Sequence, residues 1–237
     1  MDSQDTVVNR LSAVILAAAK EHRQLPTERE LCQSLGISRT ALREHLQALE
    51  VVGLLRRDQG RGTFVQSPDG TALGRVLDLA MLADGVPPED LMFVRRVLER
   101  ESASLAAGRL EQNAQARMRV LTALMRAPLP AQEIADADHE FHMLLLQWSG
   151  NAALQLLGAS LSGALHRSMR AMREYLAADR RAQLDMARAH ERILDAVIAG
   201  DQHRAWREMD HHFTLNQRIA RRIERKASAA ASSAATS

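Results

Sequence analysis

The chain has 237 residues, 46% of them hydrophobic, and its 31 basic and 29 acidic side chains give a net charge of +2. This composition excludes a chain that is disordered throughout, and the balanced charge excludes a polycation that coats nucleic acid without selection. The single cysteine, Cys32, has no partner for an internal disulfide, which favours a reducing compartment.

The first apolar run, Leu11 to Ala19, has the length of a signal-peptide core. Acidic Asp2 and Asp5 precede it, where a signal peptide carries positive charge. Its apolar positions recur at helical spacing, which predicts a first helix packed on its own domain. No run reaches the roughly 18 apolar residues of a membrane span. We therefore expect a cytoplasmic protein without a membrane partner.

Residues 25–65 contain two short helical patterns joined by a glycine turn, followed by two β-prone runs around a glycine-rich tip. Pro26 and Thr27 suit the start of the first helix, Gly36 turns the chain, and Ser38 caps the second helix. This is the order of elements in a winged helix-turn-helix, a DNA-binding fold.

The second helix of this unit has two distinct faces. Three leucines share one face, and three polar side chains share another face, turned by roughly 110° around the axis. Arginine suits the guanine edges of the major groove, and Thr40 suits a phosphate or a thymine methyl group. The helix is therefore predicted to lie in a DNA groove. The two faces consist of Leu42, Leu46 and Leu49, and of Arg39, Arg43 and Gln47.

Two β-prone segments, Leu54 to Arg57 and Thr63 to Val65, predict a hairpin after this helix. At its tip Gly60 and Gly62 let the backbone approach a sugar-phosphate rail, and Arg61 supplies positive charge. For any single arginine of this unit, the alternative to DNA binding is an ordinary side chain on the solvent-exposed surface. Their order and spacing together favour DNA binding.

The composition changes after residue 66, where turn-forming residues begin and the β-prone pattern ends. We predict a DNA-binding domain at 1–66, a linker at 67–72, an all-helical domain at 73–226 and a disordered tail at 227–237. The expected fold class is mainly α, with a winged helix-turn-helix and a small β-hairpin before a bundle of about seven helices. The predicted helices are 71–83, 88–108, 112–126, 131–149, 152–177, 180–199 and 201–226.

The segment LPTERELCQSLGISRTALREHLQALEVVGLLRRDQGRGTFV resembles the N-terminal domain of the GntR family of bacterial transcription regulators, nearly position for position. At Ala41 many relatives carry a polar residue, so the resemblance does not imply a base or phosphate contact at this position. The DNA contacts that the resemblance implies are Arg29, Arg39, Arg43, Gly60 and Gly62, with Thr27, Ser38 and Thr40 as phosphate or base-edge neighbours.

The second domain carries a possible metal site. Asp138 and His142 lie four positions apart within DADHEFHMLLL and project from the same helix face. His190 and His212 begin and end a segment of two helices that, folded antiparallel, could bring both imidazoles to the first pair. Three imidazoles and one carboxylate suit zinc, nickel, manganese or iron. From the residues alone, hydrogen-bonded core histidines are the alternative.

Four segments, FVRRVLERESASLAAGRL, DHEFHMLLLQWSGN, AHERILDAVIAGD and HHF, are similar to the effector-binding FCD domain of the FadR subfamily, over most of residues 73–222. The resemblance implies a divalent metal inside a helical bundle. Ala189 and Phe213 replace the usual Glu and Leu beside two of the histidines, which removes no ligand. The implied ligands are Asp138, His142, His190 and His212; His139, His166, His203 and His211 are interpreted as bystanders, with His211 an open alternative to His212.

Arg95, in FVRRVLE, matches an arginine that in relatives faces the same cavity and binds an effector carboxylate. An ion pair with Glu99, four positions on, is the alternative.

Together these patterns predict a ligand-responsive transcription regulator, a repressor in our interpretation. It is expected to bind double-stranded DNA at a palindromic operator as a homodimer and to respond to a small organic acid near the metal. Two rivals are a metal-dependent hydrolase and an architectural DNA-binding protein without a ligand. We expect no enzyme, because no general base or nucleophile with a recognisable spacing accompanies the ligands.

Overall fold

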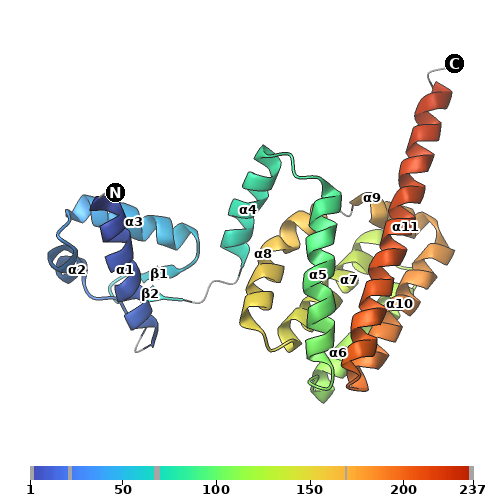
Figure 1. The fold of residues 1–237 in the computed structure, drawn as a ribbon, viewed down its shortest axis with the longest axis horizontal. Coiled ribbons are helices and arrows are strands. Elements are labelled where there is room, and N and C mark those ends of the chain that lie inside the picture. The colour runs from blue at the N-terminus through green and yellow to red at the C-terminus, as the bar shows by residue number, and fades with distance from the viewer. Residues whose placement is uncertain (1–2, 21–22, 67–69, 169, 235–237) are drawn as a thin grey trace. The chain divides into compact units, whose positions relative to one another are not determined.

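The computed structural model describes residues 3–20, 23–66, 70–168 and 170–234. The backbone alone is described for residues 3–6, 88, 163–168, 170–171, 173 and 226–234. The chain divides into two compact units, Met1–Ala80 and Met81–Ser237. The predicted fold class is confirmed, because the described residues form 11 helices and one two-stranded sheet (Figure 1).

The first unit contains three helices and an antiparallel hairpin. Strand pairing joins Leu55 to Val65 and Asp58 to Gly62. The N–H of Leu25 donates to the Thr63 carbonyl at 2.8 Å, so the segment before the second helix extends the hairpin. The elements are α1 (Ser3–Lys20), α2 (Glu28–Leu35), α3 (Arg39–Val51), β1 (Leu55–Asp58) and β2 (Gly62–Val65).

Local capping signals set the ends of α2 and α3. Thr27 and Glu30 form a reciprocal capping box, in which each side chain accepts a hydrogen bond from the backbone N–H of the other residue. Gly36 ends α2 with φ 70°, in the left-handed region that glycine favours. Ser38 accepts from the N–H of Ala41 at 3.2 Å and so begins α3. The predicted helix-turn-helix therefore follows from these residues.

Leucines form the core of the first unit. Leu42 and Leu46 of α3 are fully buried in one cluster with Leu11 of α1 and Leu31 of α2. The predicted packing of the first helix on its own domain is thereby confirmed. Burial of the leucine face of α3 leaves the neighbouring polar face, which carries Arg39 and Arg43, exposed.

The helix α4 (Thr71–Ala83) contains the division between the two units. A Cβ built on Gly53 would lie 3.3 Å from the Cβ of Ala72, so the start of α4 contacts the turn after α3. The division therefore falls later in the chain than the boundary predicted from composition. Residues 67–69 of the predicted linker lie outside the described residues.

The second unit is a helical bundle. α5 packs against α7 and α11, α10 packs against α6 and α11, and α6 packs against α7, so these five helices form a closed cycle of contacts (Figure 1). α8 adds to α5 and α7, and α9 to α7, α10 and α11. The helices are α5 (Pro88–Ala106), α6 (Gln112–Arg126), α7 (Ala131–Trp148), α8 (Ala152–Ser168), α9 (Arg170–Ala178), α10 (Arg180–Ile198) and α11 (Gln202–Ala234).

Most predicted helix ends lie within two residues of the observed ones, and α11 is the exception. It continues to Ala234, through most of the segment that was predicted to be disordered. Alanine, the commonest residue of that segment, has the highest intrinsic helix propensity, which explains the continuation. The helix predicted at 152–177 corresponds to α8 and α9, which flank residue 169.

The core of the second unit lies inside the cycle of helices. Met118 and Leu121 of α6, Phe141 of α7, Ile193 of α10 and Met209 of α11 are almost fully buried there. The histidines described below lie beside this core. Among the described residues, no helix combines the length and the apolar composition that crossing a membrane requires.

Candidate functional site

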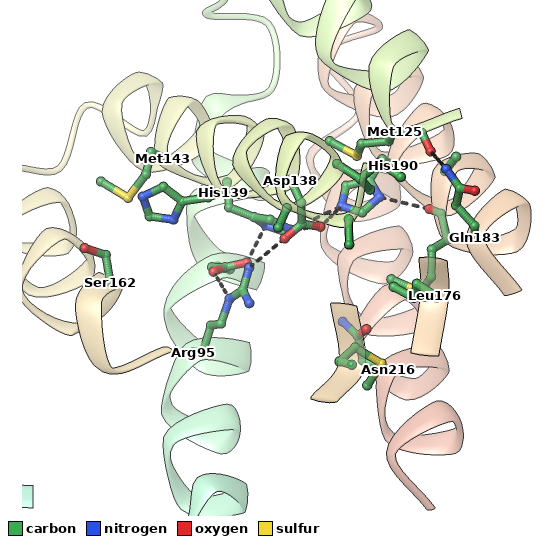
Figure 2. Close-up of a pocket in the computed structure, with 18 of the residues that line it drawn as sticks. Arg95, Met125, Asp138, His139, Met143, Ser162, Leu176, Gln183, His190 and Asn216 are labelled. Carbon is green, nitrogen blue, oxygen red and sulfur yellow. Dashed lines mark hydrogen bonds and ion pairs between the residues drawn. The ribbon is translucent and has the colours of Figure 1, made fainter. Parts of the chain in front are cut away.

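Four predicted metal ligands meet inside the second unit. Asp138 and His142 come from α7, His190 from α10 and His212 from α11. The three histidines are buried, and each offers a ring nitrogen within 4.8 Å of those of the other two. Asp138 Oδ1 lies 3.0 Å from His190 Nε2 and 3.7 Å from His142 Nε2. Figure 2 shows Asp138 and His190 pointing toward one another.

The oxygen atoms next to Nδ1 of two histidines favour the tautomer that is protonated at Nδ1. His190 Nδ1 lies 2.9 Å from the carbonyl oxygen of Met186, and His142 Nδ1 lies 2.5 Å from Glu99 Oε2. These oxygens only accept hydrogen bonds, so each Nδ1 carries the proton. A ring that is protonated at Nδ1 alone presents a lone pair at Nε2. The two Nε2 atoms are only 3.2 Å apart, so two lone pairs and a carboxylate oxygen face one another.

His212 and Asn216 add two unsatisfied groups on α11. His212 Nδ1 and Asn216 Oδ1 are buried and have no hydrogen-bond partner among the described residues. Asn216 Nδ2 lies 3.0 Å from His212 Nε2. A buried polar atom without a partner costs about 1–3 kcal/mol. This donor set therefore fits a divalent cation, which the three imidazoles and the Asp138 carboxylate could hold.

Electrostatics in the bundle favour an ionised Asp138 and a neutral His212. Burial lowers the pKa of His142, but the Glu99 and Asp138 carboxylates outweigh it and raise the net pKa. Burial opposes ionisation of Asp138, but His142 and His190 outweigh it and hold the pKa of this carboxyl well below its usual value. Burial, followed by the neighbouring His190 and His142, lowers the pKa of His212 well below that of a free histidine. An ionised Asp138 and a neutral His212 are the forms that bind metals.

Glu99 of α5 links the histidines to Arg95. Its Oε1 accepts from Arg95 Nε at 2.5 Å, while its Oε2 lies 2.5 Å from His142 Nδ1. Arg95 NH2 also lies 3.9 Å from Asp138 Oδ2. Burial raises the pKa of Glu99, but the Arg95 charge and then His142 outweigh it, so the net pKa is lowered. The two interpretations of Arg95 are therefore compatible, because the residue pairs with Glu99 and also lines a cavity.

The cavity has a free volume of about 80 Å³, next to the histidines. One water needs roughly 10–15 Å³ by the same measure, so there is room for several waters or a small ligand. Figure 2 shows Arg95 reaching from α5 toward Asp138, with His190 beyond it. Polar groups from three helices therefore meet at one wall of the cavity.

The histidines interpreted as bystanders have different surroundings. His203 and His211 are exposed, whereas His212 is 1% exposed, so His212 rather than His211 faces the other histidines. His139 is half-buried and lines the cavity, but it is not part of the histidine cluster. The side chain of His166 lies outside the described residues.

The predicted DNA-contacting side chains gather on the surface of the first unit. Arg39, Thr40 and Arg43 of α3 are exposed, as is Arg29 of α2. Thr27 and Ser38 are also exposed, and both act as helix caps. All six therefore surround the two helix N-termini, where backbone N–H groups favour phosphate.

Arg43 is paired with Glu28 of α2. Its Nε donates to both carboxylate oxygens of Glu28, at 3.2 and 3.0 Å, and its NH2 lies 3.0 Å from Oε2. The Arg43 side chain is 63% exposed, so the pair lies at the surface. Surface ion pairs contribute little to stability, and this one orients a guanidinium on the predicted reading face.

The wing tip is built around glycine. Gly60 and Gly62 have φ values of 75° and 112°, in the region that favours glycine. A Cβ on Gly62 would lie 2.9 Å from Gln24 Nε2, which donates to the Arg61 carbonyl at 2.8 Å. Arg61 is exposed. The segment before α2 therefore supports the hairpin tip.

Sequence reasoning missed three residues beside these sites. Glu99 was considered only as a partner of Arg95, because its contact with His142 depends on how α5 packs against α7. Glu28 was missed for the same reason, since its partner Arg43 is on another helix. Asn216 carried a local signal, because it follows His212 by four positions on one helix face.

Comparisons with known proteins identify the family that each unit matches. Residues 3–65 match the family described as bacterial regulatory proteins, gntR family, and residues 90–215 match the FCD domain. The Glc operon transcriptional activator of Escherichia coli (strain K12) is 34% identical over 221 residues, covering 87% of this chain and 84% of the activator.

A second relative and a solved structure are also similar over most of the chain. The HTH-type transcriptional regulator LutR of Bacillus subtilis (strain 168) is 31% identical over 193 residues, covering 81% of this chain and 88% of LutR. The solved structure of Streptococcus agalactiae GntR has a TM-score of 0.62 and 25% identity, covering 90% of this chain and 98% of that one. The curated relatives are transcription regulators rather than enzymes.

Proposed function

The chain belongs to the GntR family of bacterial transcription regulators and carries an FCD effector-binding domain, and from this premise we propose that a metal-bound carboxylate controls its binding to DNA. The proposal has three parts: a divalent metal held by the second unit, an organic acid in the adjacent cavity, and an operator bound by the first unit of a homodimer.

The observation that carries the metal proposal is the close approach of two lone pairs. His142 Nε2 and His190 Nε2 face each other at 3.2 Å, while their Nδ1 atoms lie beside the oxygen atoms of Glu99 and Met186. In this arrangement a cation supplies the positive charge that the facing lone pairs and Asp138 require. Zinc, nickel, manganese and iron all accept this donor set, and when bound such an ion offers an open position to a carboxylate oxygen.

The proposed acid site depends on charge beside the cavity. Arg95 is buried to 6% exposure, and Glu99 and Asp138 hold its guanidinium at the cavity wall. A guanidinium suits a carboxylate because it offers paired N–H donors. The chain covers 84% of a relative named for the Glc operon and 88% of LutR, which supports a role in operon control.

The DNA proposal assigns base reading to Arg39 and Arg43 and backbone contact to Arg29 and Arg61. One recognition helix reads only a few base pairs, so two of them on a palindromic operator add affinity and spacing selectivity. The acid shifts DNA affinity by preferring one arrangement of the dimer over another. Repression stays a prediction. In vitro transcription from a promoter that the protein binds distinguishes repression from activation.

Metal analysis of purified full-length protein tests the first part of the proposal. We expect about one divalent ion per chain, and a loss of most of it in His190→Ala. The matched control is His203→Ala, which removes an exposed histidine of α11 and should leave the metal content unchanged. Unchanged metal content in His190→Ala, or wild-type protein that binds no added metal, would overturn the metal site.

A further inference from the structure

The cavity beside the histidines has one polar wall, and most of the remaining lining is apolar. Four methionine thioethers from four helices contribute to it, together with leucines from α8 and α9. Methionine adapts its shape to what it contacts, and it offers no strong hydrogen bond to a hydroxyl group. The residues used in the argument are Met125, Met143, Leu161, Met172, Leu176 and Met186.

Figure 2 shows how these groups are distributed around the cavity. Met143 lies on one side of Asp138, and Met125 and Leu176 lie on the other side. Arg95 and Asp138 lie between them. A ligand whose carboxylate meets the polar wall therefore extends the rest of its structure along thioethers and aliphatic side chains.

Several polar residues of the lining are already engaged. Gln183 Nε2 donates to the carbonyl oxygens of Met125 and Ala127, each at 2.8 Å, and its Oε1 accepts from Arg180 at 2.7 Å. The Ser162 hydroxyl donates to the carbonyl of Ala159 at 2.8 Å. Among the described lining residues away from the polar wall, Asn216 Oδ1 is a buried acceptor without a hydrogen-bond partner, which is far fewer polar groups than the hydroxyls of a sugar acid need.

This distribution discriminates between classes of acid. A sugar acid carries a hydroxyl on nearly every carbon, and each hydroxyl buried without a partner costs about tenfold in affinity. Each methylene group buried in the same place instead raises affinity by about fourfold. A second carboxylate among the methionines would be a buried charge without a counterion, which is more costly still.

We infer that the effector is a monocarboxylic acid with an apolar tail of a few carbons, and not a sugar acid or a dicarboxylate. This inference rests on the proposed function, because it assigns the chemical class of the acid that the cavity takes. The carboxylate of the acid contacts the polar wall at Arg95, and its tail lies against Met143 and Leu161. The cavity volume of about 80 Å³ limits the tail to a short one.

Calorimetric titration of the full-length protein, with one equivalent of Zn²⁺, tests the inference with four acids. Hexanoate, gluconate and adipate all have six carbons, and acetate has the carboxylate with almost no tail. We expect hexanoate to bind at least tenfold more tightly than each of the other three. Gluconate or adipate binding as tightly as hexanoate would overturn the inference and leave the proposed function standing. Absence of binding by all four would overturn both.

Two variants test where the tail lies. Met143 is half-buried and outside the described core clusters, so Met143→Gln introduces an amide of similar size at the cavity wall. We expect it to weaken hexanoate binding by at least threefold while acetate binding stays unchanged. Met92→Gln makes the same change on α5, outside the cavity lining, and should leave both affinities unchanged. Equal losses for acetate and hexanoate in Met143→Gln would contradict the placement of the tail.

Discussion

Glu99 should determine how tightly the second unit holds its metal, although it is not a ligand. Its Oε1 accepts from Arg95 Nε and its Oε2 lies beside His142 Nδ1, each at 2.5 Å, and the residue is 5% exposed. In Glu99→Gln one oxygen becomes an NH₂ group, which donates and must face one of these two N–H groups. The variant therefore leaves one of these two N–H groups without an acceptor. Where that group is the N–H of His142, the tautomer of His142 is no longer fixed.

The magnitude follows from the role of such outer hydrogen bonds. Loss of the group that orients a metal-binding histidine typically weakens metal affinity by 10- to 100-fold, or about 1.4–2.7 kcal/mol. Competition titration against a chelator of known affinity measures this change. Glu101→Gln on the same helix is the control, because Glu101 is exposed and bonds only to Trp206 Nε1 among the described contacts.

A second variant separates misfolding from loss of orientation. In Arg95→Met with Glu99→Gln, the amide no longer faces a guanidinium and can turn its oxygen to His142. Metal affinity should then recover part of the loss, because the two substitutions are coupled through one hydrogen-bond network. Metal affinity unchanged in Glu99→Gln would refute the reasoning, as would an equal loss in Glu101→Gln.

Three further predictions concern the first unit. Arg39→Ala or Arg43→Ala should weaken operator binding by about 1–3 kcal/mol with little change in nonspecific binding, measured by fluorescence anisotropy; equal losses on both duplexes would leave only phosphate contact. Glu28→Gln should release Arg43 from its ion pair, raise nonspecific affinity and steepen the salt dependence by about one unit, so an unchanged slope would argue against competition between Glu28 and DNA. Gly62→Ala should lower the free energy of unfolding by about 1–3 kcal/mol, because its φ is 112° and a Cβ would lie 2.9 Å from Gln24 Nε2. Gly60→Ala, with nothing within 4 Å, should cost less in thermal melts, and the reverse order would contradict this account of the wing.

The DNA-binding unit could be predicted from the sequence because its signals are local. The capping residues Thr27 and Ser38, the turn glycine Gly36 and the leucine spacing of α3 each act within one or two helical turns. Periodicity gave the buried face of α3 correctly, with Leu42 and Leu46 in the core. The end of α11 was missed, since an alanine-rich tail without apolar anchors also forms helix readily.

The metal site could be predicted only in part. Asp138 and His142 share one helix face, so their spacing alone places them together. The approach of His190 and His212 depends on the packing of α10 and α11 against α7 and α5, so the residues alone left it open and the family resemblance favoured it. The contact between Glu99 and His142 joins two helices and carries no local signal. The apolar lining of the cavity comes from six helices, so no single stretch of sequence reveals it.

The central claim is that an acid bound beside the histidines controls binding to DNA by the other unit. Anisotropy titrations test it most directly, with a duplex that the wild-type protein selects from a random pool and the acid that binds most tightly in calorimetry. We expect the acid to change operator affinity by about 5- to 150-fold in wild-type protein and to have no effect in His190→Ala, which still binds the duplex. An equal acid response in His190→Ala, or none in metal-loaded wild-type protein, would contradict the account.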